Sequence, residues 1–264
     1  MFEYSFMIRS LIVGVMLSII IPMIGIIMIN RKTAMIGDAL SHTSLAGIAI
    51  GLIAGINPLW TSLIICVIAS FMIEIIRRKF NRFGDMATAI VMSTGIAIAA
   101  ILSDFTPGGS TFESFMFGSI TTVSQEDVFI VLGIFIIVVI VSLYFYYALL
   151  YNSINPVMAR LAGVKTDLVD GLFTLITAVT VAISAKTVGA LMITSLMTIP
   201  VASSLMICKS YKSTYITSII LSVIFMILGI TASFYIGIKP GGAIVLIAIL
   251  FLIITSIVTY LNKK

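Results

Sequence analysis

Apolar segments about as long as a lipid bilayer is thick recur along the whole chain, and this pattern constrains the fold more than any other sequence feature. A transmembrane helix needs about 20 predominantly apolar residues. The hydropathy pattern predicts nine such segments, which cover approximately residues 10–29, 34–54, 58–76, 87–103, 128–150, 170–185, 188–207, 214–236 and 242–261. We therefore expect an all-α, polytopic transmembrane helical bundle in which residues 1–264 form a single domain.

Charged residues are too few to cover a water-facing surface. They make up 9% of this chain, and hydrophobic residues make up 61%. A soluble domain has about 25% charged residues, so the composition excludes a sizeable soluble catalytic domain. The sequence also lacks the GxxxxGKS/T motif that holds ATP phosphates in P-loop proteins. The chain is therefore not expected to hydrolyse ATP by that route.

The distribution of Lys and Arg predicts the orientation. With nine spans and the N-terminus outside, three basic residues lie outside (Arg9, Lys186 and Lys239) and 12 lie in the cytoplasm. This is the bias that the positive-inside rule describes, and it explains the net charge of +5 without a nucleic-acid partner. The cytoplasmic residues are Arg31, Lys32, Arg77, Arg78, Lys79, Arg82, Arg160, Lys165, Lys209, Lys212, Lys263 and Lys264.

The connection at residues 185–187 is the weakest part of this topology because it is very short. If residues 170–207 formed one bent span, everything downstream would invert, and the basic residues would divide 9 to 6 between the two sides. The larger bias of the nine-span arrangement favours an outside N-terminus and an inside C-terminus.

Two loops are long enough to have a role of their own. The stretch 103–127 holds four acidic residues and no Lys or Arg, and we expect it outside. The stretch 151–169 is predicted to be cytoplasmic. It contains a short helical pattern that starts at Pro156 and is closed by Gly163, the usual asymmetry of helix ends. Such a helix can simply turn the chain, or it can dock a soluble partner.

Asp38 and His42 are ionisable residues inside a predicted span, where such groups are costly and tend to mark function. They are four residues apart and therefore share one helix face. A carboxylate and an imidazole supply half of a zinc or manganese coordination shell. Spacing alone leaves other interpretations open. Asp38 could be stabilised by its helix dipole, His42 could hydrogen-bond between helices, and the pair could relay protons.

Small residues recur every four positions along the same predicted span, at Gly47, Gly51 and Gly55. This spacing is typical of helices that approach each other closely, so we predict a packing role for the three glycines. Cys66 and Cys208 each stand alone in apolar runs, which supports neither a disulfide nor a metal site.

The segment Gly37–His42 resembles the GD-x-LSH signature of the membrane permeases of zinc, manganese and iron ABC importers. Residues 92–97, 117–127 and 188–200 are also similar to landmarks of that family, so the resemblance covers nearly the whole chain in order. It implies a transporter permease subunit in the bacterial cytoplasmic membrane. It also implies a transported divalent metal, no permanently bound cofactor, and ATP hydrolysis by a separate subunit.

The same resemblance implies the partners. They are a second copy of the chain, a cytoplasmic ABC ATPase, an extracellular or periplasmic metal-binding protein, and the membrane lipids. Asp38 and His42 match the positions that contact metal in the family. Residues 155–166 match the coupling helix that presses into the ATPase, and Ala159, Arg160 and Gly163 are the expected contact residues.

One chain supplies one His and one Asp, too few to hold zinc alone, whereas two chains about a two-fold axis would supply two of each. Residues 43–47 lack the proline that manganese and iron members carry after the His, which favours zinc. A manganese or iron importer is the alternative. A proton-coupled secondary transporter, with Asp38 and His42 as the relay, is a further one.

Overall fold

The computed structural model describes residues 4–80, 84–106, 109–119 and 123–261, and every regular element in these ranges is helical. The helices are α1 (Ser5–Asn30), α2 (Met35–Ala54), α3 (Pro58–Lys79), α4 (Gly84–Ser103), α5 (Gly109–Phe117), α6 (Gln125–Tyr144), α7 (Tyr146–Ile154), α8 (Pro156–Leu161), α9 (Thr166–Ser184), α10 (Ile193–Ile207), α11 (Tyr211–Ile236) and α12 (Pro240–Leu261). A π-helical turn at Ala185–Gly189 and a 3₁₀ turn at Ala190–Met192 connect α9 to α10.

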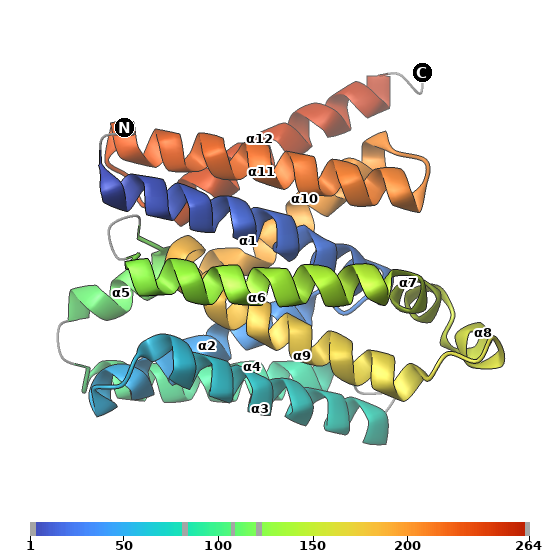
Figure 1. Ribbon diagram of the computed structural model, residues 1–264, viewed down its shortest axis with the longest axis horizontal. Helices are drawn as coiled ribbons and strands as arrows, with labels where there is room; N and C mark the ends of the chain where they lie inside the picture. The colour runs from blue at the N-terminus through green and yellow to red at the C-terminus, as the bar shows by residue number, and fades with distance from the viewer. Residues whose placement is uncertain (1–3, 81–83, 107–108, 120–122, 262–264) are drawn as a thin grey trace.

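Eight helices in the described part of the chain are long and apolar enough to cross a membrane: α1, α2, α3, α4, α6, α9, α11 and α12. The remaining predicted segment, 188–207, contains α10, a shorter apolar helix of 15 residues. The segments predicted at 170–185 and 188–207 are separate helices that run in opposite directions (Figure 1). The predicted helical bundle is therefore confirmed, while its orientation in the membrane stays a prediction.

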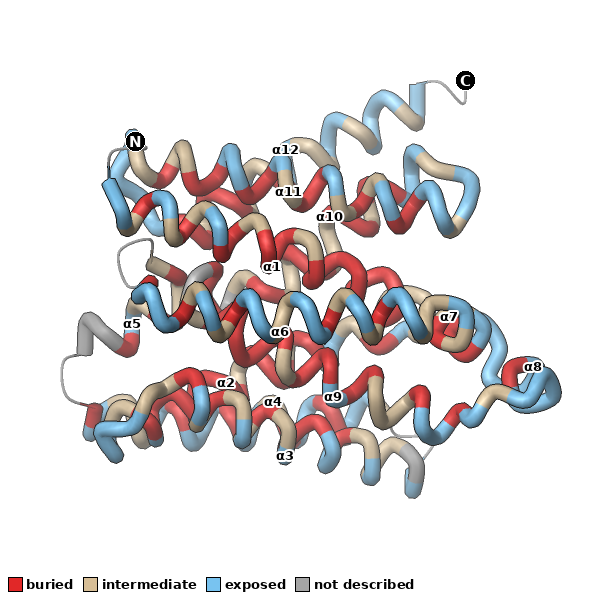
Figure 2. The backbone as a smooth tube through the Cα atoms, in the orientation of Figure 1, coloured by how far each residue is buried: buried red, intermediate tan, exposed pale blue. Residues whose placement is uncertain are grey.

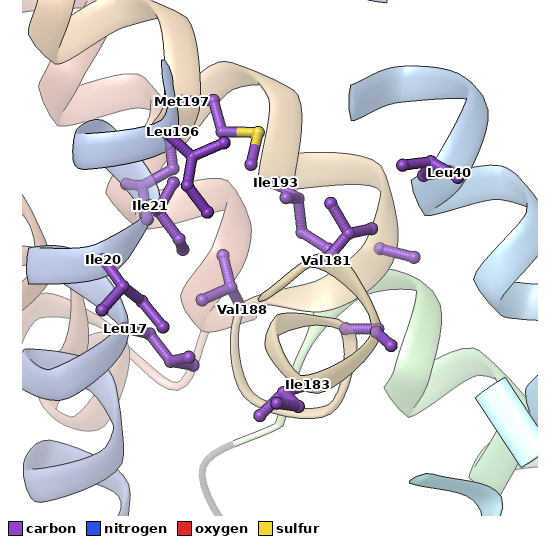
Figure 3. Close-up of a cluster of buried hydrophobic side chains, with 14 of the residues drawn as sticks. Leu17, Ile20, Ile21, Leu40, Val181, Ile183, Val188, Ile193, Leu196 and Met197 are labelled. Carbon is purple, nitrogen blue, oxygen red and sulfur yellow. The ribbon is translucent and has the colours of Figure 1, made fainter. Parts of the chain in front are cut away.

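The buried core lies along α1, α2, α9 and α10, and the outer helices expose apolar side chains. In α1, 78% of its most apolar stretch is buried, against 11% in α12 (Figure 2). Side chains of α1 (Leu17, Ile20 and Ile21) pack with Ile193 and Leu196 of α10 in the centre of the bundle (Figure 3). Because the outward-facing residues of α12 are also apolar, the surface suits a surrounding of lipid rather than water.

Close backbone approaches hold α2 between α3 and α4. A Cβ atom on Gly47 would lie 2.6 Å from the Cα of Ser62 in α3, and one on Gly95 of α4 would lie 2.8 Å from the Cα of Thr43. Real Cβ atoms do not tolerate such distances, so only glycine fits at these two crossings. Helix α2, which carries Asp38 and His42, is therefore held from one side by α3 and from another by α4.

The connecting segments gather at the two ends of the bundle. Helices α7 and α8 lie at the end where α12 finishes, and α5 lies at the opposite end, where α1 begins (Figure 1). Lys239, just before α12, forms an ion pair with Glu113 of α5, and its Nζ lies 4.2 Å from the ring centroid of Phe117. The acidic stretch 103–127 is thus tied to the start of α12.

Candidate metal transit site

Asp38 and His42 lie in the first two turns of α2 and face the same side of it. The distance from His42 Nε2 to Asp38 Oδ1 is 3.8 Å. The His42 side chain is 21% exposed and that of Asp38 is 37% exposed. Asp38 stands in the first turn of α2, where the positive end of the helix dipole stabilises a carboxylate. Both groups are therefore placed to reach an ion from one side of the helix.

Thr194 in the first turn of α10 also belongs to this site. Its hydroxyl donates a hydrogen bond to Asp38 Oδ1 at 3.2 Å, across 156 residues of sequence. No motif or spacing in the sequence indicates this residue, because threonines are common in apolar helices and normally bond to their own backbone. The fold brings it to Asp38 by packing α10 against α2.

The site of one chain is incomplete for a structural zinc ion. Across the described residues, no group of three or more His, Cys, Asp and Glu side chains is close enough to hold a metal. Neither cysteine joins the pair: Cys66 Sγ contacts the carbonyl of Leu40 at 3.5 Å, and Cys208 Sγ contacts Thr217 Oγ1 at 3.3 Å. Structural zinc sites have four ligands, so two or more must come from elsewhere.

Arg31, at the end of α1, is paired with a carboxylate other than Asp38. Arg31 Nη2 lies 2.5 Å from Asp170 Oδ1, and the guanidinium Cζ lies 4.8 Å from the ring centroid of Phe173. Asn152 of α7 also donates to Asp170, at 2.8 Å. The cluster joins the ends of α1, α7 and α9, and it leaves Asp38 free of a pairing with Arg31.

A cavity of about 460 Å³ lies beside this cluster at the α8 end of the bundle. Its lining includes Arg31, Arg77 and Arg160 together with Glu74 and Asp170. Neither Asp38 nor His42 lines it. Because both charge signs are present, the cavity does not by itself select a cation, and the α2 pair remains the better candidate site.

A second buried ion pair, which sequence reasoning missed, lies near the other end of the bundle. Lys186 Nζ in the π-helical turn is 2.6 Å from Asp127 Oδ2, and the two side chains are only 16% and 4% exposed. The same oxygen of Asp127 accepts hydrogen bonds from the amide and hydroxyl of Ser124, which caps α6. The pair therefore fastens the α9–α10 connection to the start of α6.

The stretch predicted to dock a partner forms the end of α7, α8 and the start of α9. Asn155 caps α8 by accepting from two backbone amides, and Gly163 closes it with φ +82°. Ala159 is 1% exposed and packs inside the chain, whereas Arg160 and Gly163 are exposed. Arg160 Nε donates to Thr166 Oγ1 at 2.7 Å. The apolar residues that α8 offers to a partner are Val157, Met158 and Leu161.

The predicted glycine stripe divides between two roles. Gly47 and Gly51 face α3, where a Cβ atom would come within 2.6 Å of Ser62 Cα and 2.3 Å of Thr61 Oγ1 respectively. Gly55 instead ends α2 in the left-handed region, with φ +67° and open space where a Cβ atom would be. It serves as the helix cap.

The fold is that of a multi-pass membrane protein with ionisable side chains inside its bundle. A model of the ABC 3 transport family matches residues 3–259. The chain belongs to this family, and it is the membrane permease subunit of a metal ABC importer of the bacterial plasma membrane, not itself catalytic.

Relatives named for different metals resemble the chain about equally. It is 30% identical to a "Probable metal transport system membrane protein" of Treponema pallidum, over 100% of this chain and 99% of the relative. It is 29% identical to the high-affinity zinc uptake protein ZnuB of Haemophilus influenzae, over 93% and 94% of the two chains. It is 26% identical to the manganese permease ScaB of Streptococcus parasanguinis, over 99% and 94%.

The fold also matches a solved structure. PsaBC from Streptococcus pneumoniae, determined with a Fab, superposes with a TM-score of 0.86 at 24% identity, over 96% of this chain and 91% of that chain. A metal-chelate type ABC transporter in an inward-facing conformation gives a TM-score of 0.77 at 13% identity, over 94% and 85%. These likenesses support the helical architecture.

Proposed function

We propose that this chain forms the translocation path of an ATP-driven zinc importer, and that Asp38 and His42 bind the ion in transit. The observation that carries the proposal is their geometry: a carboxylate and an imidazole 3.8 Å apart on one side of a membrane helix. Ionisable groups at such positions usually line an ion pathway. Imidazole and carboxylate are both ligands that zinc accepts.

The ligand number favours a site shared by two chains. Each chain contributes one imidazole and one carboxylate, and a two-fold axis beside α2 would supply two of each, a complete tetrahedral set. A cation bound between the two carboxylates also lowers the free-energy cost of burying the carboxylate charges and the cation charge. The homodimer is therefore part of the proposal.

Relatives named for zinc and for manganese are similarly close to this chain, so the comparisons do not decide between the two metals. The preference for zinc rests on ligand chemistry. Manganese sites usually have six oxygen-rich ligands, whereas zinc accepts four that include imidazole. Residues 43–47 also lack the proline expected of manganese and iron permeases. A manganese or iron importer is the second candidate, favoured by the relatives named for manganese uptake.

The remaining partners follow from the importer assignment. We propose that a cytoplasmic ATPase docks at α8 and that a metal-binding protein delivers the ion at the opposite end. The exposed apolar face of α8 supports the first contact. Helix α5 lies at the end opposite α8 (Figure 1). If the ATPase docks at α8, the delivery protein would bind at the α5 end.

Uptake by proteoliposomes that contain the permease and its cognate ATPase tests the proposal. We expect zinc uptake to require ATP and to be lost in Asp38→Ala and His42→Ala, while the ATPase still co-purifies. Asp104→Ala, which removes an exposed carboxylate at the end of α4, serves as the matched control and should transport normally. Undiminished uptake in both α2 variants would overturn the assignment, and uptake driven by a pH gradient without ATPase would establish the proton-coupled alternative.

A further inference from the structure

The hydroxyl of Thr194 makes an unusual contact for a threonine in a membrane helix. Such a hydroxyl normally donates to the backbone carbonyl four residues earlier in its own helix. Thr43, Thr177 and Thr198 do so here, at 2.7, 2.8 and 2.9 Å. Thr194 instead donates to Asp38 Oδ1, the side chain of another helix.

Thr194 lies just after the break between α9 and α10. The residue four positions before Thr194 is Ala190, which lies in the 3₁₀ turn outside α10. At this break the hydroxyl of Thr194 bonds across to α2, and not to the chain that precedes it. One turn further on, Thr198 finds its acceptor within α10 and bonds to it.

The break itself is held firmly in place. Gly189 has φ +94°, a conformation that favours glycine, and a Cβ atom there would lie 2.4 Å from the backbone N of Gly118. Val188 of the same turn is buried against α1 and α10 (Figure 3). The Lys186–Asp127 ion pair adds a third attachment. These three attachments hold the connection that precedes Thr194 against the rest of the bundle.

The contact restricts how Asp38 can bind a metal. A hydroxyl bonded to Oδ1 fixes the rotation of the carboxylate and occupies one of the lone pairs on that oxygen. Symmetric binding of a metal through both oxygens then becomes less favourable, and binding through one oxygen remains possible. Single-oxygen ligation suits a four-coordinate ion such as zinc, whereas larger six-coordinate ions gain more from additional oxygen ligands.

We propose that Thr194 is a positioning residue for Asp38 and biases the transit site toward a four-coordinate metal ion. This inference rests on the proposed role of Asp38 in binding the transported ion. Thr194 acts through the carboxylate, as groups that hydrogen-bond to metal ligands commonly do. Thr194 is the second residue of α10. Its contact with Asp38 therefore brings the positive end of the α10 dipole close to the carboxylate.

Three substitutions of similar size separate this role from simple packing. Thr194→Val keeps the shape and removes the donor, Thr194→Ser keeps the donor, and Thr198→Val removes an equivalent half-buried hydroxyl one turn along α10. Each variant is measured in the complete transporter with its ATPase in proteoliposomes. The readouts are the KM and kcat of zinc uptake and the ratio of zinc to manganese taken up in competition.

We expect Thr194→Val to raise the KM for zinc about tenfold, the lower end of the effect of removing a partner of a metal ligand, with little change in kcat. The zinc-to-manganese ratio should fall in the same variant. Thr194→Ser and Thr198→Val should behave like the wild type. A wild-type KM and ratio in Thr194→Val, or equal defects in the Ser and Val variants, would overturn the inference.

The failure of this inference can be distinguished from failure of the proposed function. If Asp38→Ala loses uptake while Thr194→Val transports normally, only the role of Thr194 is refuted. If Asp38→Ala and His42→Ala both transport normally, the transit site itself is refuted. Zinc binding is also measured on purified Thr194→Val permease. Only samples that elute like the wild type are used, so that misfolding is excluded as the cause of a raised KM.

Discussion

At the scale of single residues, the buried pair of Lys186 and Asp127 has the clearest energetic consequence. Removing one partner of such a pair leaves the other charge buried and uncompensated, at a cost of about 3–5 kcal/mol. We therefore expect Lys186→Met to lower the unfolding temperature strongly in detergent. The double variant Lys186→Met/Asp127→Asn should recover most of the loss, because an amide oxygen can still accept the Ser124 hydrogen bonds that cap α6.

Lys239→Met provides the control for this measurement. Its ion pair with Glu113 is about half exposed, and exposed pairs contribute about 0–1 kcal/mol. The unfolding temperature should change little. Equal losses in the Lys186 and Lys239 variants would contradict the role assigned to burial.

The site shows which residue contacts a sequence can predict. Asp38 and His42 are four apart on one helix, so their common face follows from helix geometry. Thr194 is 156 residues away from Asp38. The predicted connection at residues 185–187 places a break before it, but nothing in the sequence shows which helix its hydroxyl then meets. The glycine spacing likewise predicts proximity for Gly47 and Gly51, whereas the cap at Gly55 depends on where α2 ends.

At the scale of elements, α8 carries the proposed contact with the ATPase. Its exposed apolar side chains are Val157, Met158 and Leu161. We expect Leu161→Asp to reduce co-purification of the ATPase and ATP-dependent uptake, because a charge would be desolvated in the contact. Phe105→Asp, a similar change at an exposed apolar residue after α4, should leave the complex intact. Normal co-purification of Leu161→Asp would argue against docking at α8.

The helical pattern of α8 was predictable from Pro156 and Gly163, but its inward face was not. Six residues are too few for a hydrophobic period to show which side is buried. The break at Phe145 is a second example: residues 128–150 were predicted as one span, yet α6 ends at Tyr144 and α7 begins at Tyr146. Aromatic residues are compatible with a continuous helix. The packing of Tyr146 against Tyr211 and Tyr215, with ring centroids 5.8 and 5.5 Å apart, accompanies the break.

At the scale of the whole molecule, the proposed shared site predicts a stoichiometry. One zinc ion should bind per two chains, because each chain offers one imidazole and one carboxylate. Titration of the purified permease, combined with its mass in detergent, measures this ratio. Binding of one ion per chain that persists after the dimer is dissociated would contradict a site formed between chains.

The overall architecture was the most predictable level, because apolar length is a direct requirement of the bilayer. The exception is α10, whose 15 residues rise about 22 Å, less than the roughly 30 Å of hydrocarbon in a bilayer. A window of apolar residues cannot distinguish a full-length helix from a shorter helix preceded by irregular turns. Both give the same mean hydropathy.

The short α10 also changes the medium that an ion meets. The helix begins part-way along the bundle (Figure 1), so its first turn, with backbone amides that lack partners inside the helix, lies away from both water-facing ends. In such a poorly screened environment, the field of a helix end and of one hydroxyl extends further than it would at a surface. A modest set of fixed dipoles can therefore shape the energy profile for an ion crossing the bundle, without a permanently charged cage that would hold the ion too long.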